Sequence, residues 1–346
     1  MTSQDLDPSD RGVARAASPI LANTQAVDVT IAIVNWNTNR LLKQCLSSLA
    51  GGTAGVRTQI IVIDNASQDG SAGMVSQDFP NVRLIANRDN FGYAWGNNQA
   101  YALAEGRHIL LLNPDTVVRP GAVQAMMEFL DRHPQAAGAT CRLLNPDGSF
   151  QRYYKRLPSW KHVLATFTVF HNLWPRNRWS RDFYMVEETF DRILEIEQPP
   201  AACLMLRHSM LQQQAIFDER FPIFFNDIDF CRSLSKRGYN LVFLPSAEIV
   251  HYGGHGGVNL MKDDAVIDYL INLIRYFRKH EGSWPGIGLW LILIVDSLLV
   301  LGVGLLKVTT TQRPAAAFGR EFRRRLRLAI GREIFQYPAD SHITTT

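Results

Sequence analysis

Short apolar runs that end abruptly in a polar side chain constrain the fold of this chain most. Three of them stand in its first third, each with its polar end: residues 29–34 before Asn35, 59–63 before Asp64, and 109–112 before Asn113-Pro114-Asp115. Runs this short and this apolar are typical of strands buried on both faces of a parallel sheet. In open α/β sheets, ligands bind at the carboxyl edge where such strands end.

The third run has the clearest boundary. Pro114 cannot donate to a sheet ladder, so the strand ends there and leaves Asp115 at the carboxyl edge. A carboxylate at this edge suits a divalent cation that also binds phosphate oxygens, because hard cations prefer oxygen ligands. A plain turn built around an aspartate explains the same residues, and this stretch alone does not separate the two interpretations.

Helical patterns alternate with the strands. Residues 37–39 provide capping side chains before a helical face at 41–49, which ends at Gly51 and Gly52. We expect further strands at 82–87, 136–144, 201–206 and 239–250, and further helices at 100–104, at 123–133 and from within 221–232 to Gly238. The order strand, helix, strand predicts a parallel βαβ unit with a right-handed crossover and hence an α/β fold.

Changes in composition divide the chain into three parts. Residues 1–27 are polar and small without periodicity, which is typical of a flexible leader. Residues 28–257 carry the α/β pattern. Within them, the aromatic and basic stretch at about 150–198 is either a flap over the acceptor side of a site or an irregular surface segment. Residues 258–346 are expected to form a helical region with a basic tail.

Charge and cysteine content exclude some classes of protein. The formal charge of +4 is mild, and much of the excess lies in the arginine-rich residues 320–327. This distribution argues against nucleic acid as a partner. The four cysteines are widely spaced and match no paired metal-site pattern, so reduced, buried thiols in a cytosolic setting are expected. The first residues lack the apolar core of a secretory signal.

Asp64 occupies the place of the ribose-binding acid in a dinucleotide-binding unit. That unit requires a glycine-rich turn after its first strand, whereas residues 35–39 read Asn-Trp-Asn-Thr-Asn, so a nicotinamide dehydrogenase is not expected. An ionised Asp64 still matches ribose hydroxyls or the N3–H of a uracil or thymine base, because it only accepts hydrogen bonds. It can equally stabilise its own turn.

Five motifs follow one another in order: Val34-Asn35-Trp36-Asn37; Asp64-Asn65 with Ser67, Asp69 and Gly70; Asn87-Arg88 with Asn90, Phe91, Gly92 and Asn97; Asn113-Pro114-Asp115; and Phe225-Asn226-Asp227-Ile228-Asp229-Phe230-Cys231. Together they resemble family 2 inverting glycosyltransferases, especially the bacterial rhamnosyltransferase branch. The resemblance covers residues 29–282 approximately. It implies the GT-A fold, a Rossmann-like nucleotide-binding mixed sheet flanked by helices, and a nucleotide-diphosphate sugar donor.

The resemblance also implies roles for single residues: Asn35, Asp64, Asp69, Asn90, Asn97 and Asn113 at the donor, Asp115 and His251 at Mg²⁺ or Mn²⁺, and Asp227 as the catalytic base. Two positions depart from the family. Asn113 stands where the family often has a second acid, so the donor phosphates and His251 carry more of the metal binding. Asn226 stands where a glutamate usually precedes the base.

Inverting transfer needs a base for the acceptor hydroxyl and a Lewis acid for the departing diphosphate. Asp227 follows Phe224 and Phe225 at an expected helix start, where desolvation and the helix N-terminus together tune its ionisation. In the plainer interpretation, Asp227 and Asp229 are first-turn acids that stabilise the helix. Arg232 either pairs with Asp229 or reaches a phosphate, and these two residues are further candidates for acceptor or phosphate contacts.

Residues 286–306 are long and apolar enough to span a bilayer. The central Asp296 opposes insertion by about 2.5–3.5 kcal/mol, which the surrounding aliphatic side chains slightly outweigh. Basic residues flank both ends and conflict with a single span under the positive-inside rule. We therefore expect a helix in the membrane interface or a shallow re-entrant hairpin, with the arginine tail drawn to anionic lipid. The alternative is a buried core or dimerisation helix, the latter in a homo-oligomer.

The sequence therefore predicts a metal-dependent inverting glycosyltransferase at the cytoplasmic face of a bacterial inner membrane. The expected reaction moves L-rhamnose from dTDP-rhamnose to a lipid-linked or saccharide acceptor in surface polysaccharide synthesis, such as that of O-antigen. Galactofuranose, glucose and GlcNAc stay open as donor sugars, because the donor-specific residues are not legible in one sequence. A sugar nucleotidylyltransferase lacks its glycine-rich, arginine-containing turn here. A non-catalytic nucleotide-sugar sensor is the alternative from another class.

Overall fold

The computed structural model describes residues 26–211, 215–221, 224–253 and 265–311, together with residues 322 and 326. Within these ranges, nine strands form one sheet in the order β3-β2-β1-β4-β8-β6-β9-β5, and β7 pairs with β9. The strands are β1 (Val29–Asn35), β2 (Thr58–Asp64), β3 (Arg83–Ala86), β4 (His108–Leu112), β5 (Thr116–Val118), β6 (Ala136–Leu144), β7 (Leu194–Ile196), β8 (Cys203–Arg207) and β9 (Asn240–His251).

The sheet is mixed. β1 is parallel to β2 and β4, and β2 is parallel to β3, so the polar ends of these strands meet at one edge. β8 lies between β4 and β6 and is antiparallel to both, whereas β9 is parallel to β6. The pairing of β1 with β2 confirms the predicted parallel unit. The edge where β4 meets the start of β8 brings the N-terminal strands next to the second half of the chain.

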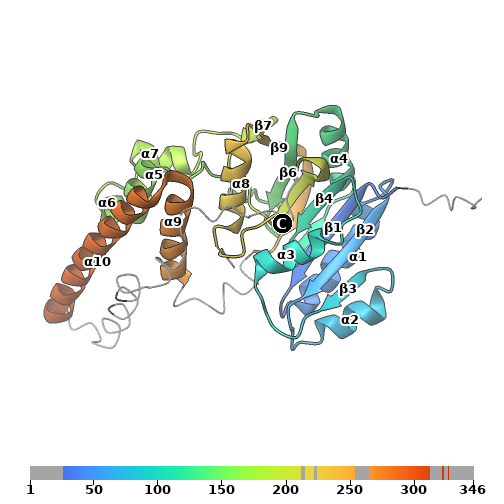
Figure 1. Cartoon of the computed structure of the whole chain (residues 1–346), viewed down its shortest axis with the longest axis horizontal. Helices are drawn as coiled ribbons and strands as arrows, with labels where there is room; N and C mark the ends of the chain where they lie inside the picture. Colours follow the sequence, from blue (N-terminus) through green and yellow to red (C-terminus); the bar gives the residue numbers. More distant parts are fainter. Residues whose placement is uncertain are drawn as a thin grey trace, which may run out of the picture.

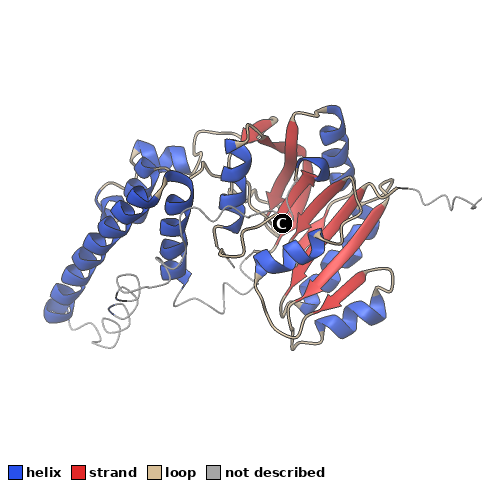
Figure 2. Ribbon diagram, in the orientation of Figure 1, coloured by secondary structure: helices blue, strands red, loops and turns tan. Residues whose placement is uncertain are grey.

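Helices cover both faces of the sheet and form a further layer beside it (Figure 2). They are α1 (Asn39–Gly52), α2 (Ser71–Asp78), α3 (Tyr93–Tyr101), α4 (Ala122–Arg132), α5 (Trp160–Phe167), α6 (Val169–Leu173), α7 (Arg178–Phe183), α8 (Asn226–Lys236), α9 (Ala265–Glu281) and α10 (Ser283–Thr311), with a 3₁₀ turn at His208–Met210.

The two faces of the sheet have separate cores. Ile31 and Ile33 of β1 pack in a cluster with residues of α1, α2 and α4, whereas Ala32 and Val34 pack in a cluster with residues of α3, α8 and α9. Neighbouring strand residues point to opposite faces, so a strand covered on both faces must be apolar along its whole length. This is the physical reason for the short apolar runs in the sequence.

A helical layer made of α5, α6, α7, α9 and α10 lies beside the sheet, and α8 lies between this layer and the sheet (Figure 1). Charged side chains join the layer to α8. Asp229 of α8 accepts hydrogen bonds from Lys279 Nζ and from His280 Nε2 of α9, each at 2.8 Å. Lys279 Nζ also donates to Asp218 at 2.8 Å. These contacts fix α8 against α9.

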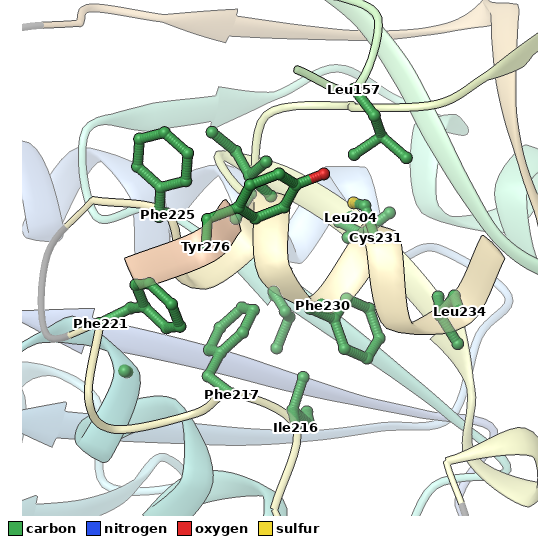
Figure 3. Packing of buried hydrophobic residues seen from close by; sticks show 14 of the residues in the cluster. Leu157, Leu204, Ile216, Phe217, Phe221, Phe225, Phe230, Cys231, Leu234 and Tyr276 are labelled. Carbon is green, nitrogen blue, oxygen red and sulfur yellow. The ribbon is translucent and has the colours of Figure 1, made fainter. Parts of the chain in front are cut away.

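Aromatic side chains fill the space around α8 (Figure 3). The rings of Phe217 and Phe230 meet edge to face at 5.8 Å, and those of Phe225 and Tyr276 lie 5.6 Å apart. Phe225 has a φ of 69° directly before α8, a left-handed conformation that costs a non-glycine residue of order 1 kcal/mol or more. Its ring is 1% exposed, so burial offsets this strain and fixes where α8 begins.

One prediction about secondary structure is wrong, and two short strands were not expected. The helix expected at 100–104 is α3, which begins at Tyr93 and ends at Tyr101. Gly92, with a φ of 89° and a ψ of 173°, turns the chain into this helix. α3 has no strong apolar period because Asn97 and Asn98 face inward, where their side chains donate to carbonyls. β5 and β7 were not expected, since three residues are too few for a pattern.

α10 contains the apolar stretch. Within the described residues, Ser283–Gly302 is long and apolar enough to cross a membrane by length and composition, and 28% of it is buried. Leu289 and Leu293 face the protein. Asp296 is also buried, and its Oδ1 accepts a hydrogen bond from Val169 N at the start of α6, at 2.6 Å. The acid predicted to oppose insertion therefore stabilises a neighbouring helix instead of facing outward.

The four cysteines are free and buried, as the sequence predicts. Residues 1–25 of the predicted leader and most of the arginine cluster at 320–327 lie outside the described residues.

Candidate active site

The polar ends of β1 and β2 form a closed hydrogen-bond network. Asn35 Nδ2 donates to Asp64 Oδ2 at 2.8 Å and to Ser67 Oγ at 3.1 Å. Thr38 Oγ1 donates to Asn35 Oδ1, and Ser67 N donates to Asp64 Oδ1 at 2.9 Å. Asn35 and Asp64 are 0% and 2% exposed. These two predicted donor residues therefore lie together, behind the surface that they hold in shape.

Asp69 connects the starts of two helices. Its carboxylate accepts hydrogen bonds from Asn39 N at 2.8 Å, in the first turn of α1, and from Ser71 N at 3.1 Å, in the first turn of α2. Burial by itself would raise the pKa of Asp69, but hydrogen bonds from Ser71 and Asn39 hold this pKa below its usual range. Asp69 thus acts as a shared cap for both helices.

The two remaining asparagines of the third motif differ in exposure. Asn90 lines a pocket at the sheet edge, and its Oδ1 accepts a hydrogen bond from Gly92 N at 2.9 Å. Asn97 is 1% exposed and donates to Tyr93 O at 2.9 Å from within α3. Asn90 therefore faces the pocket, whereas Asn97 lies behind its wall.

Asp115 and His251 meet in the same pocket. β5 pairs antiparallel with β9, with Thr116 opposite His251, and this register brings Asp115 beside the histidine. His251 Nε2 lies 3.3 Å from Asp115 Oδ1, and neither side chain is more than 9% exposed. Asn113, another predicted donor residue, also lines the pocket.

Gln151 fixes the orientation and the tautomer of His251. Its Nε2 donates to His251 O and to Asn145 Oδ1, so its Oε1 faces the ring and lies 2.9 Å from His251 Nδ1. An amide oxygen only accepts hydrogen bonds, so Nδ1 must be the donor. The tautomer is assigned from these partners: in the neutral imidazole, Nε2 carries a lone pair that points toward Asp115.

This arrangement fits a divalent cation. Asp115 Oδ1 is buried without a hydrogen-bond partner among the described residues, and it faces the lone pair of His251 Nε2. Two electron-pair donors that face each other suit a cation between them. No group of three metal-ligating side chains occurs within the described residues, so further ligands would have to come from elsewhere, for example from phosphate oxygens.

Asp227 lies in the first turn of α8 and lines the same pocket as Asp115 and His251. Its Oδ1 accepts a hydrogen bond from Ile228 N at 2.9 Å. Burial raises the pKa of Asp227, although backbone hydrogen bonds and the positive charge of Lys155 oppose this effect. A carboxylate with a raised pKa binds a proton more readily, which suits a general base.

Two other charged residues of α8, Asp229 and Arg232, have partners outside the pocket. Asp229 is 3% exposed and binds Lys279 and His280. Arg232 donates to Glu281 at 2.7 Å, so the pair with Asp229, one of the two alternatives for this arginine, is not formed. Arg232 borders a different cavity, between α5, α8 and α9. Of the three charged residues in this helix start, Asp227 is the one that faces the pocket.

The irregular stretch after β6 supplies two residues that the sequence did not single out. Gln151 holds His251, and Lys155 lines the pocket. Between them, the ring of Tyr153 meets the edge of His251 at 6.2 Å, while Tyr154 is buried in a separate aromatic cluster. Positions 151, 153 and 155 thus face the site and 154 faces away. This alternation is the signal that marks the segment as part of the site.

Known proteins share this architecture. The family model described as Glycosyl transferase family 2 matches residues 30–214, more than half of the chain. The N-acetylglucosaminyl-diphospho-decaprenol L-rhamnosyltransferase of Mycobacterium tuberculosis is 26% identical over 317 residues, which cover 87% of this chain and 98% of that protein. The low-salt glycan biosynthesis hexosyltransferase Agl10 of Haloferax volcanii is 22% identical over 66% of this chain and 68% of its own.

A solved structure supports the fold. The mannosyltransferase PcManGT from Pyrobaculum calidifontis, in complex with GDP-Man and Mn²⁺, superposes with a TM-score of 0.53 over 89% of this chain and 88% of its own, at 14% identity. At this identity the likeness concerns the fold alone. The mixed sheet with its flanking helices is the expected GT-A arrangement.

Proposed function

The chain belongs to glycosyl transferase family 2, and on that basis we propose that it transfers L-rhamnose from dTDP-rhamnose to a lipid-linked acceptor, with inversion at the sugar carbon. The observation that carries the proposal is one pocket that Asp115, His251 and Asp227 line together. The rhamnosyltransferase of Mycobacterium tuberculosis, matched over 98% of its length, supports the choice of sugar and the diphospho-polyprenol acceptor.

Asp227 is the proposed base. Its carboxylate takes the proton of the acceptor hydroxyl while the hydroxyl oxygen bonds to the sugar carbon and the bond from that carbon to the diphosphate breaks. Attack from the face opposite the leaving group inverts the configuration. The raised pKa of Asp227, which burial causes, increases its affinity for this proton.

Asp115 and His251 would hold Mg²⁺ or Mn²⁺, with the donor phosphates as further ligands. When bound, the cation supplies Lewis acidity to the leaving diphosphate. Gln151 keeps His251 Nε2 free to ligate by accepting from Nδ1. Asn113 contributes a neutral amide to this wall of the pocket, which leaves more of the charge neutralisation to the donor itself.

The nucleotide would lie against Trp36, Asn65 and Asn90, which line the pocket at the ends of the N-terminal strands. A further set of predicted donor contacts already has hydrogen-bond partners inside the protein: Asn35, Asp64, Asp69 and Asn97. Their direct contact with the donor stays a prediction. Their present contacts support a second role, in which they hold the strand ends and helix starts around the nucleotide.

The outer face of α10 supports a position at the cytoplasmic surface of a membrane. Leu291, Val295, Leu298 and Leu299 are each at least 50% exposed and lie on one face of the helix, because they stand four, seven and eight positions after the first. Leu173 at the end of α6 is 81% exposed. With Asp296 turned inward, this face can enter the interfacial layer of a bilayer without burying a charge.

A donor panel tests the proposal. The protein is heated with Mg²⁺ or Mn²⁺ and dTDP-rhamnose, UDP-galactofuranose, UDP-glucose or UDP-GlcNAc, since a ligand that prefers the native state raises the midpoint of unfolding. We expect the largest rise with dTDP-rhamnose, followed by sugar transfer to N-acetylglucosaminyl-diphospho-polyprenol. A larger rise of the unfolding midpoint with another donor would replace L-rhamnose with the sugar of that donor in the proposal. Donor binding without transfer to any acceptor would favour a nucleotide-sugar sensor.

A further inference from the structure

Lys155 is a cation without a carboxylate partner in the wall of the pocket. Among the described residues that line it, Lys155 is the one lysine or arginine, and no carboxylate there lies within ion-pair distance of its ammonium group. Its ammonium lies over two aromatic rings instead, 5.8 Å from the centre of Phe183 and 5.6 Å from that of Tyr184. Cation–π contacts hold the head group in place but leave its charge uncompensated.

This position is unfavourable for an ammonium group until an anion arrives. Burial lowers the pKa of Lys155, and the negative charge of Asp227 opposes that effect. A partly desolvated charge without a partner costs free energy, which an anionic ligand returns on binding. The pocket therefore carries, beside its base, a site for negative charge that the protein itself does not fill.

The location of Lys155 indicates which anion this is. Asp115 and His251, the proposed cation site for the donor diphosphate, meet where β5 pairs with β9. Lys155 lies over rings of the helical layer instead, and it lines the pocket together with Asp227 of α8 and Tyr269 of α9. These helical residues form the wall that the acceptor would have to use, because the strand ends are proposed for the nucleotide.

An aromatic strip leads away from Lys155 into the helical layer. The ring of Phe183 lies 5.8 Å from that of Phe167, and Phe167 lies 5.3 Å from Tyr269. Phe167 ends α5, which is followed directly by α6 and its exposed Leu173. The strip thus connects the cation with the apolar surface proposed to meet the membrane.

We propose that Lys155 binds the phosphate of a lipid-linked acceptor, whose sugar hydroxyl lies at Asp227 and whose lipid chain follows the aromatic strip toward α6 and α10. This inference rests on the proposed function, and it adds the residue that recognises the acceptor phosphate and the path of the lipid chain. A phosphorylated acceptor brings negative charge close to the carboxylate of Asp227. An ammonium group between them reduces this repulsion and keeps the base ionised.

Matched acceptors and matched variants test the assignment. Lys155→Met removes the charge and keeps most of the length, and Lys155→Arg keeps the charge. Lys161→Met is the control, because Lys161 lies nearby on α5 but is half exposed and pairs with Asp182. Each protein is assayed with two acceptors that share one sugar: N-acetylglucosaminyl diphosphate with a short alkyl chain, and the neutral alkyl glycoside of N-acetylglucosamine.

For Lys155→Met we expect the KM of the diphosphate acceptor to rise roughly 10- to 100-fold, the range for losing a hydrogen bond to a charged group. The KM of the neutral acceptor and the Kd of the donor should stay within about twofold, given a contact confined to the acceptor phosphate. Lys155→Arg should recover most of the loss, and Lys161→Met should match the wild type. Thermal unfolding of each variant shows whether it is folded.

Other outcomes overturn the assignment. Weaker donor binding in Lys155→Met would show that Lys155 binds the donor diphosphate. An equal loss of activity with both acceptors would show that Lys155 acts through Asp227 and not on the acceptor phosphate. Calorimetry of the diphosphate acceptor keeps the test independent of turnover. A wild type that binds this acceptor without transfer contradicts the proposed function alone, whereas binding that Lys155→Met leaves unchanged, or no binding at all, contradicts the role of Lys155.

Discussion

The two sides of the pocket differ in how far the protein satisfies its own polar groups. On the nucleotide side, Asp64 accepts hydrogen bonds from Asn35 Nδ2 and from Ser67 N. Asp69 accepts hydrogen bonds from the first turns of two helices. On the catalytic side, Asp115 Oδ1 has no hydrogen-bond partner and Lys155 no ion pair among the residues that the structure describes.

This difference separates residues that hold the pocket in shape from residues that bind the ligands and take part in the reaction. A saturated network holds its members in one geometry, and breaking it is costly because each buried partner is left unsatisfied. Unsatisfied charged groups are unfavourable in the free protein and gain most when a ligand arrives. We therefore expect substitutions on the first side to change stability and those on the second side to change binding and turnover.

The strongest test concerns Asp227. Asp227→Asn should lower the transfer rate about 10²- to 10⁴-fold, the usual contribution of a general base, while the donor Kd stays unchanged. Initial rates and calorimetry measure the two effects. Asp229→Asn is the matched control on the same helix. It should lower stability, because Lys279 and His280 lose the negative charge that they bind, and it should leave the transfer rate unchanged. Substantial turnover in Asp227→Asn would remove it as the base.

Asp115 should follow in size. Asp115→Ala should abolish metal-dependent donor binding, with a loss beyond the roughly 10- to 100-fold typical of residues that only support a metal ligand. Calorimetry of dTDP-rhamnose with and without Mn²⁺ measures this loss. Unaltered metal-dependent affinity would show that the cation binds elsewhere.

Gln151 should give the intermediate effect. Gln151→Leu removes the acceptor for His251 Nδ1 and should weaken Mn²⁺ binding in the presence of dTDP about 10- to 100-fold. Calorimetry reports this without turnover. Gln198→Leu makes the same change at a residue that lines the pocket, and no hydrogen bond joins its side chain to His251. Equal losses in both variants would contradict a specific role for Gln151.

The closed side should respond in stability. Asp64→Ala removes one of the two acceptors of Asn35 Nδ2 and the acceptor of Ser67 N, so the free energy of unfolding should fall by about 1–3 kcal/mol. Urea unfolding measures this change. If stability is unchanged but donor binding is lost, Asp64 contacts the nucleotide directly. That result would contradict the expectation that substitutions on the nucleotide side change stability and not binding.

The smallest expected effect is a gain. The pKa of Asp227 is raised in the folded state, so its ionised form destabilises the protein at neutral pH, and this penalty disappears as the pH falls through the raised pKa. Asp227→Asn should therefore unfold at a higher temperature than the wild type at pH 7, with a difference that shrinks toward acidic pH. A difference that grows on acidification would contradict the burial of a charged base.

Local patterns were enough for the N-terminal half of the sheet. The runs that end at Asn35, Asp64 and Asp115 became β1, β2 and β4 with their polar ends at one edge, because strands buried on both faces must be apolar throughout. The start of α8 was also predicted. α3 was misplaced, since its buried amides donate to backbone carbonyls and leave no apolar period.

By itself, the sequence determined the α/β class, the family and the candidate residues, because these depend on periodicity and on short motifs. Only the tertiary structure decided which candidates face a common pocket. Gln151 and His251 lie 100 residues apart and meet through the pairing of distant strands. Asp227 and Asp229 stand two positions apart on one helix, yet one lines the pocket and the other binds α9. Side-chain partnerships across that distance arise from packing, which no local pattern records.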